Sequence, residues 1–179
     1  MLIRNARPED ARYMADACVQ VARFMRQGVV DKYIVGFPDE ANDDMVKWAE
    51  GFVSAVKRVA FVAEAPGGER IGCIFGKIEA SNMPISVSEE VGTISVCWVE
   101  SNHRRSGVGR ALLAEIETWF LARGIRHLEV AFMAKNETAG ETWTHLGFSP
   151  FRVFAYKDIS EHQGGGYSPP SARSVQSTP

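Results

Sequence analysis

The stretch Arg104-Arg105-Ser106-Gly107-Val108-Gly109-Arg110-Ala111 says most about the fold of this 179-residue chain. A strand-like run precedes it at 91–99, and a helical pattern follows at 108–123. Backbone N–H groups at the start of a helix have no partner inside the helix, and they carry the positive end of its dipole. Gly107 and Gly109 lack a Cβ, so a ligand can approach the backbone closely. The sequence therefore predicts a turn that holds phosphate or pyrophosphate.

The turn differs from two common nucleotide-binding loops. No Gly-Lys-Ser/Thr ends it, as a Walker-type loop requires, and Leu112 stands where the dinucleotide fingerprint has its third glycine. The pattern is instead Arg-x-x-Gly-x-Gly, beginning at Arg104. Taken alone, this hexamer fits a plain strand-to-helix connection as well as a binding turn, so the surrounding sequence has to decide.

Four further segments accompany the turn. Residues 94–100 form an apolar run before it, and Asn136-x-x-Ala139 and Leu146-Gly147-Phe148 follow it, while residues 3–10 read as a strand and a helix cap. In this order and at these spacings the segments resemble the GNAT superfamily of acetyl-CoA-dependent N-acetyltransferases. The signature of that family is Gln/Arg-x-x-Gly-x-Gly/Ala after the fourth strand, then N-x-x-A and L-G-F. The resemblance covers roughly residues 1–159.

The resemblance implies an α/β, GNAT-like (acyl-CoA N-acyltransferase) fold, in which a central mixed, largely antiparallel sheet is flanked by helices in a single domain. The residue pattern agrees, with the element order β-α-α-β-β-β-α-β-α-β and a right-handed strand–helix–strand unit at 91–132. We expect the domain to span 1–159 and residues 160–179, rich in Gly, Pro, Ser and Gln, to form a disordered tail. The predicted strands are 2–6, 59–65, 71–80, 91–100, 125–132 and 148–158, and the predicted helices begin near Pro8 and Asn42 and span 108–123 and 137–146.

Periodic apolar positions predict which faces of the first two helices are buried. Gly124 is placed to end the helix at 108–123. The predicted buried positions are Ala11, Met14, Ala15, Cys18, Val21, Ala22 and Met25 in the first helix, and Met45, Trp48, Ala49, Phe52, Val53 and Val56 in the second.

Composition narrows the classes of partner. The formal net charge of −2 supplies no basic field for nucleic acid, and no apolar run approaches the length that spans a membrane. Cys18, Cys73 and Cys97 are widely spaced in apolar patterns, which predicts reduced core residues in a cytoplasmic protein. The four histidines lack ligand spacing, so we expect no metal.

The resemblance also implies where acetyl-CoA, the expected co-substrate, would bind. The pyrophosphate would lie on the amides of 104–109, with Arg105 or Arg110 either paired with phosphate or solvated. The pantetheine arm would pair with the fourth strand at Cys97 and Val99, and the Cys97 N–H would polarise the acetyl carbonyl. Asn136 would contact the pantetheine end, cap a helix, or do both. The expected cofactor-binding residues are Cys97, Trp98, Val99, Arg104, Arg105, Ser106, Gly107, Val108, Gly109, Arg110, Asn136 and Trp143.

Two proton-transfer groups of the family are replaced here. Trp143 stands where many members have a tyrosine that protonates the leaving thiolate, and Thr93 stands where some have a strand carboxylate as base. Tyr156, Ser95 or a water remain as candidate acids. The remaining candidate bases are Glu100, Glu79, Glu129 and His145, with Glu100 and Glu79, acting through water, ranked first.

The implied activity is transfer of acetyl to a primary amine of a small molecule or amino-acid-like acceptor, by direct attack in a ternary complex. A covalent route through the Cys97 thiol is disfavoured, because a buried thiol without a basic neighbour is inert. The alternatives are a protein or peptide N-terminal acetyltransferase and a non-catalytic CoA-binding sensor or interaction module. We expect the first two helices and the loop between them at 24–42, with the 81–90 connection and the last strand, to select the acceptor. The loop carries Phe24, Tyr33, Phe37, Asp31, Asp39 and Glu40, which either suit an amine or form a packed loop with solvated acids. The family also contains homodimers, and the sequence leaves that question open.

Overall fold

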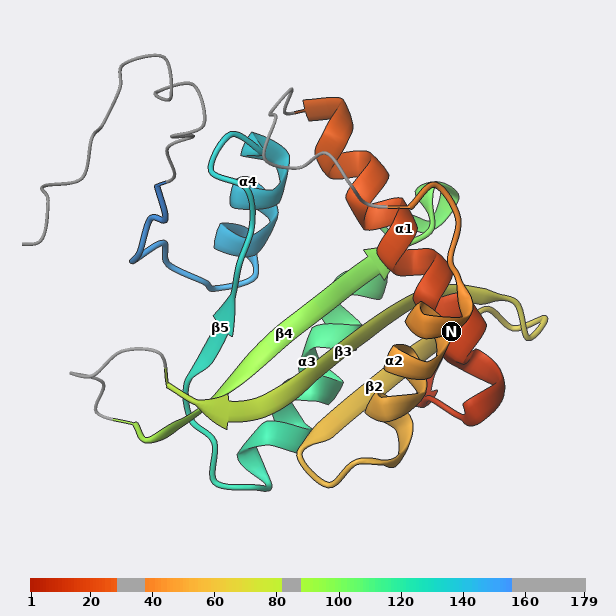
Figure 1. Ribbon diagram of the computed structural model, residues 1–179, viewed down its shortest axis with the longest axis horizontal. Coiled ribbons are helices and arrows are strands. Elements are labelled where there is room, and N and C mark those ends of the chain that lie inside the picture. Colours follow the sequence, from red (N-terminus) through yellow and green to blue (C-terminus); the bar gives the residue numbers. More distant parts are fainter. Residues whose placement is uncertain (29–37, 82–87, 156–179) are drawn as a thin grey trace, which may run out of the picture. The chain divides into compact units, whose positions relative to one another are not determined.

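The computed structural model describes residues 1–28, 38–81 and 88–155 (Figure 1). Its first compact unit is Met1–Ser149, and a second begins at Pro150. All the helices and strands described below belong to the first unit. Residues 29–37 of the predicted acceptor loop, with Tyr33 and Phe37, and the predicted tail at 160–179 lie outside the described residues.

A single five-stranded sheet forms the centre of the first unit. Its strands lie in the order β1-β2-β3-β4-β5, and only the β4–β5 pair is parallel. The predicted mixed, largely antiparallel sheet is therefore confirmed. The strands are β1 (Leu2–Asn5), β2 (Arg58–Glu64), β3 (Arg70–Ala80), β4 (Glu90–Val99) and β5 (Leu128–Val130).

Helices cover both faces of this sheet (Figure 1). On one face lie α1 (Ala11–Gly28), which follows the short helix η1 (Pro8–Asp10), and α2 (Asp43–Ser54). On the other face lies α3 (Val108–Leu121). The short helix η3 (Ser101–His103) leads from β4 towards α3, and α4 (Glu137–His145) follows β5.

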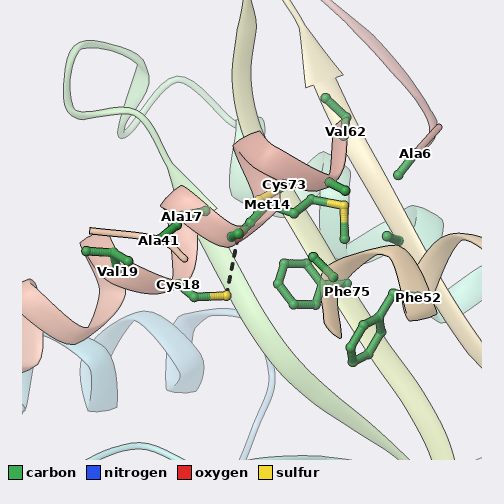
Figure 2. Close-up of a cluster of buried hydrophobic side chains, with 14 residues drawn as sticks. Ala6, Met14, Ala17, Cys18, Val19, Ala41, Phe52, Val62, Cys73 and Phe75 are labelled. Carbon is green, nitrogen blue, oxygen red and sulfur yellow. Dashed lines mark hydrogen bonds between the residues drawn. The ribbon is translucent and has the colours of Figure 1, made fainter. Parts of the chain in front are cut away.

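The α1/α2 core is the apolar cluster between those helices and the sheet (Figure 2). Cys73 and Phe75 of β3 point into it, and Phe52 of α2 packs edge-on against Phe75 with ring centroids 5.0 Å apart. Cys18 is buried in the same cluster, where its thiol donates a hydrogen bond to the Met14 carbonyl at 3.3 Å. The buried members of the α1/α2 core are Ala6, Ala11, Met14, Ala15, Ala17, Cys18, Val19, Ala41, Ala49, Phe52, Ala60, Val62, Cys73 and Phe75.

The α3 core occupies the opposite face. Alternation along β3 places Ile74 there, between Cys73 and Phe75. Gly92 permits close packing of α3, because a Cβ at this position would lie 2.8 Å from the Phe120 ring. The buried members of the α3 core are Val59, Phe61, Ala63, Ile71, Ile74, Ile94, Val108, Leu112, Leu113, Ile116, Phe120 and Ile125.

The second helix ends two residues before the last position of its predicted apolar pattern, Val56. The Asn42 side chain caps α2 by accepting a hydrogen bond from the Met45 N–H at 3.0 Å. The helix ends at Ser54, so Val56 lies beyond it and is 87% exposed, and its predicted burial is wrong. Trp48 is 43% exposed, although one edge of its ring packs against Phe52.

Two predicted strands are also wrong in extent. Gly124 ends α3 with φ of 79°, and Ile125 N–H donates to the Phe120 carbonyl, so this residue belongs to the helix cap rather than to a strand. The strand predicted at 125–132 is therefore only β5. Residues 148–155 contain no strand, because Pro150 has no N–H to donate to a ladder. Residues 156–158 lie outside the described part.

One buried carboxylate ties the first strand to the first helix. The Asp10 side chain is 0% exposed and accepts hydrogen bonds from Arg4 Nη1 at 2.6 Å, Arg70 Nε at 2.6 Å and the Arg7 backbone N–H at 2.8 Å. Arg4 also pairs with Glu64. Burial raises the pKa of Asp10, but the hydrogen bonds outweigh burial and bring this pKa down to about 2. The carboxylate is thus charged and fully partnered.

Candidate active site

The turn at the start of α3 has the backbone geometry of an anion-binding loop. Gly107 is the N-cap of α3 with φ of 89°, a left-handed conformation that glycine adopts at low cost. Arg105 is also left-handed, with φ of 60°, and Ser106 Oγ donates to the His103 carbonyl at 2.5 Å. The Ala111 N–H donates to the Gly107 carbonyl, so the three amides of residues 108–110 precede the first intrahelical bond and face outward.

The side chains of the turn divide by exposure. Arg104, Arg105, Ser106 and Arg110 are exposed, while Val108 is 2% exposed in the α3 core. The predicted residues of the turn therefore lie side by side with an accessible backbone. The buried Val108 side chain holds the turn against the α3 core.

A second feature is the open edge of β4. Its ladder with β5 covers only Gly92–Ile94, paired with Leu128–Val130, and beyond it the two strands part (Figure 1). Ser95 is a β-bulge, because the β3 partners step from Ile94 directly to Val96. From Ser95 to Val99, β4 has no neighbouring strand on the β5 side among the described residues.

The direction of the β4 amides follows from two hydrogen bonds. Glu100 N–H donates to the Ile71 carbonyl of β3 at 3.0 Å, so the alternating Val99 and Cys97 amides point away from β3. Gly92 N–H donates towards β5, to the His127 carbonyl at 3.0 Å. Without a bulge, the Glu100 and Gly92 N–H groups would point to the same side of β4. The bulge at Ser95 shifts the alternation of N–H directions by one residue, so Glu100 donates to β3 and Gly92 towards β5. Two N–H groups, those of Cys97 and Val99, therefore face the open edge.

The Cys97 thiol is poorly suited to nucleophilic attack. Burial raises its pKa to about 12, so the group is a neutral thiol at physiological pH. Its side chain packs against the α3 core, on the sheet face opposite α1 and α2. Direct transfer is the mechanism that this environment favours.

Glu100 is held by two neutral donors. Its Oε1 accepts hydrogen bonds from Tyr13 OH and from Trp98 Nε1, each at 3.1 Å. Burial is the largest effect on Tyr13, with Cys73 and Glu100 adding to it, and the pKa of the phenol is raised far above its usual value. Tyr13 has no signal in the sequence, because it lies 87 residues from its partner.

Arg104 lies against the same tryptophan. Its guanidinium is 4.6 Å from the Trp98 ring centroid and 5.6 Å from that of Phe24, and its Nε donates to the Val99 carbonyl at 3.0 Å. The end of β4, the turn and α1 are thus linked through Trp98.

Glu79 does not meet the turn. It pairs with Val91 in the β3–β4 ladder, and Val91 lies six residues before Cys97, roughly 20 Å along the strand. Burial raises the pKa of Glu79, but hydrogen bonds from Lys77 and Thr93 outweigh burial, and the pKa lies below its usual value. Such a carboxylate is a weak base.

The residues of α4 have structural partners. Asn136 is the N-cap of α4, with Oδ1 accepting from the Ala139 N–H at 3.0 Å. Trp143 packs against the α3 core and edge-on to Phe148, with centroids 5.2 Å apart. His145 is exposed, and its Nδ1 lies 2.8 Å from the Glu141 carbonyl. Tyr156 lies outside the described residues.

The described ranges contain neither a metal-binding group nor a membrane-spanning helix. No three His, Cys, Asp or Glu side chains in residues 1–28, 38–81 and 88–155 gather as a metal-binding group. No helix in those ranges is long and apolar enough to cross a bilayer.

Comparison with known proteins decides the family. The sequence model of the Acetyltransferase (GNAT) family matches residues 22–148. The chain belongs to this family. It is 30% identical over 154 residues to Aminoglycoside N(6')-acetyltransferase type 1 of Stenotrophomonas maltophilia, covering 86% of this chain and 90% of that protein. A shorter match, 38% identical over 55 residues, to Acetyl transferase GW6a of Oryza sativa subsp. japonica covers 30% of this chain and only 13% of that protein.

Solved GNAT structures share the fold. A tetramutant of BH1408 protein from Bacillus halodurans superposes with a TM-score of 0.75 at 17% identity, covering 89% of this chain and 100% of that one. AAC(6')-Iy in complex with the bisubstrate analog CoA-S-monomethyl-acetylneamine gives 0.67 at 22% identity, covering 88% and 97%. The predicted GNAT-like fold is confirmed, and the family assigns the chain as an acetyl-CoA-dependent N-acetyltransferase.

Proposed function

We propose that this GNAT enzyme transfers acetyl from acetyl-CoA to a primary amine of a small molecule or amino-acid-like acceptor, by direct attack in a ternary complex. The observation that carries the proposal is the open edge of β4, where the Cys97 and Val99 amides point away from β3. An extended amide-bearing arm such as pantetheine can add to this edge like a further strand. The edge leads directly to the Gly107 turn.

The turn would hold the pyrophosphate. The outward amides of residues 108–110 and the positive end of the α3 dipole favour an anion there. The exposed guanidinium groups of Arg105 and Arg110 are available as charge-assisted donors. The Cys97 N–H would then meet the acetyl carbonyl, and one such donor stabilises developing negative charge by about 3 kcal/mol.

The acceptor class is supported by the relative that matches most of the chain. That protein is named an aminoglycoside N(6')-acetyltransferase, which favours a small amine-bearing molecule over a peptide N-terminus. In the transfer, the neutral amine attacks the thioester carbonyl, the C–N bond forms, the nitrogen loses a proton to water or a base, the C–S bond breaks, and CoA leaves as thiolate. Trp143 cannot protonate that thiolate, so Tyr156, Ser95 or water is the acid, or no dedicated acid is used.

We also propose a cytoplasmic location for this protein. Cys18, Cys73 and Cys97 are all free thiols, which fits a reducing compartment.

Calorimetric titration with acetyl-CoA tests the cofactor site. The matched variants are Gly109→Ala and Gly109→Trp, because a Cβ at this position meets only Val99 Cγ2, at an ordinary 3.8 Å. We expect wild type and Gly109→Ala to bind at about micromolar concentrations, and Gly109→Trp to bind at least about tenfold more weakly with an unchanged circular dichroism spectrum. Normal affinity in folded Gly109→Trp would refute the placement of the pyrophosphate.

Release of CoA thiol in the presence of a panel of amines tests the reaction. Turnover with small amines supports the proposed activity. Acetylation of peptide N-termini alone would support the N-terminal acetyltransferase. Cofactor binding without any turnover would support the CoA-binding sensor.

A further inference from the structure

A cavity of about 370 Å³ lies where α2 and α3 end beside the start of β2. Its lining contains two arginines, Arg58 and Arg123, and no aspartate or glutamate. Arg58 pairs with Lys77 of β3, five residues along that strand from Gly72, which pairs with Val99. The cavity is therefore roughly 17 Å along the sheet from the end of β4 that leads to the Gly107 turn, and it is separate from the proposed transfer site.

Each of the two arginines is held against an aromatic ring. The Arg123 guanidinium lies 3.8 Å from the Trp119 ring centroid, and the Arg58 guanidinium lies 5.2 Å from the Phe52 ring centroid. Gly51 leaves room for Arg58, because a Cβ at this position would lie 2.9 Å from Arg58 Nη1. A guanidinium that packs on a ring keeps the N–H groups of its edge available. Both groups are thus positioned before a ligand arrives, which lowers the cost of ordering them.

The two guanidinium groups have no anionic partner in the described part of the chain. Both side chains are exposed, and each carries five N–H donors. Arg123 Nη1 donates to the Trp119 carbonyl at 3.3 Å, while the Arg58 side chain forms no hydrogen bond with a described residue. Most of these donors are therefore available to a ligand. Phosphate and carboxylate oxygens match the planar fork that arginine presents.

Hydrogen-bond acceptors border the same cavity. The last four carbonyls of a helix have no partner within it, and Phe52, Val53 and Ser54 of the last turn of α2 line the cavity. Hydroxyl groups of a ligand can donate to such carbonyls while its anionic group binds the arginines. The volume is near the lower end of the range for small-molecule sites, about 300–1,000 Å³, which suits a compact ligand.

We propose that this cavity binds a small polyhydroxylated anion, such as a sugar phosphate or a sugar acid, with its phosphate or carboxylate oxygens on Arg58 and Arg123. Because both arginines contact the charged group, the site selects anions over neutral sugars. The assignment is independent of acetyl transfer, since none of its residues belongs to the Gly107 turn or to the open edge of β4.

Calorimetric titration with glucose 6-phosphate, gluconate and glucose tests the assignment, because these molecules share hydroxyl groups and differ in their charged group. We expect wild type to bind at least one of the two anions with a Kd below about 1 mM, and glucose much more weakly. Arg58→Gln and Arg123→Gln should each weaken anion binding about 10–100-fold with an unchanged circular dichroism spectrum. Tighter binding of glucose 6-phosphate assigns a phosphorylated ligand, and tighter binding of gluconate assigns a sugar acid.

Two control variants should bind the anion as wild type does. Arg126→Gln removes the same charge from an exposed side chain outside the lining, and Gly109→Trp alters the turn. Four results would each overturn the assignment: no binding of either anion below about 1 mM, equal binding of glucose, wild-type affinity in both folded cavity variants, or an equal loss in either control. Since this binding needs no acetyl-CoA, its failure leaves the proposed acetyl transfer unaffected.

Discussion

Two carboxylates of this GNAT protein stand in opposite situations. Asp10 is 0% exposed and accepts four hydrogen bonds, three of them from the guanidinium groups of Arg4 and Arg70. Glu129 is half-buried and has no partner among the described residues. Asp10 joins β1, β3 and the start of α1, whereas Glu129 stands where two strands part. A buried charge that the fold itself neutralises serves stability, while a charge without a partner in the fold has no such role.

The largest effect is expected at the partnered carboxylate. Asp10→Asn keeps the shape but leaves Arg4 and Arg70 without their anion, and we expect the free energy of unfolding to fall by about 3 kcal/mol. Urea unfolding measures the change. The control is Glu9→Gln, an exposed side chain 3.9 Å from Arg7, which should change stability by less than about 0.5 kcal/mol. If Asp10→Asn lowers the free energy of unfolding by less than about 1 kcal/mol, Asp10 does not have the stabilising role given to it here.

The same network predicts a dependence of stability on pH. The folded pKa of Asp10 is about 2, below its ordinary value of 3.8, so its contribution is complete above about pH 4 and is lost as the pH falls through 2. Between pH 4 and pH 2, wild type should lose about 2 kcal/mol more stability than Asp10→Asn. Denaturant unfolding at each pH gives both curves, and parallel curves would contradict the prediction.

A smaller effect is expected at Glu100. Gln can still accept hydrogen bonds from Tyr13 and Trp98, so Glu100→Gln should keep kcat within about tenfold of wild type. A general base would instead contribute about 10²–10⁴-fold to the rate. Steady-state kinetics therefore distinguish a positioning role from a basic one, and a loss of 100-fold or more would restore Glu100 as the base.

The smallest effect is expected at Cys97. Its thiol is neutral because burial raises the pKa to about 12, and its proposed role belongs to the backbone N–H, which Cys97→Ala retains. Activity should stay within about threefold of wild type. Mass spectrometry of the wild-type protein with acetyl-CoA supplies the second readout, since an acetylated Cys97 would show a covalent route.

Local signals predicted the architecture well. Several features depend on only a few adjacent residues, and the structure contains all of them. They are the glycine turn, the helix caps at Asn42 and Asn136, and the left-handed Gly124. The strands predicted at 125–132 and 148–158 were wrong because an apolar run does not say whether a partner strand lies beside it. The cap at Gly124 and the proline at 150 interrupt those runs.

The candidate site was less predictable, because it depends on pairing between distant residues. The outward direction of the Cys97 amide depends on the bulge at Ser95, which only the β3–β4 register reveals. The sequence ranked Glu79 above Glu129 as a base, but it could not show that Glu79 is held by an ion pair with Lys77 and a hydrogen bond from Thr93. No local pattern marks the Tyr13–Glu100 hydrogen bond.

Arg104 also covers part of the open edge of β4. By the same alternation that turns the Val99 N–H outward, the Val99 carbonyl faces the open edge, and Arg104 Nε occupies it at 3.0 Å. Unpaired strand edges attract other chains and promote aggregation. A positive side chain bonded across this edge blocks one pairing position and therefore disfavours strand addition by another chain.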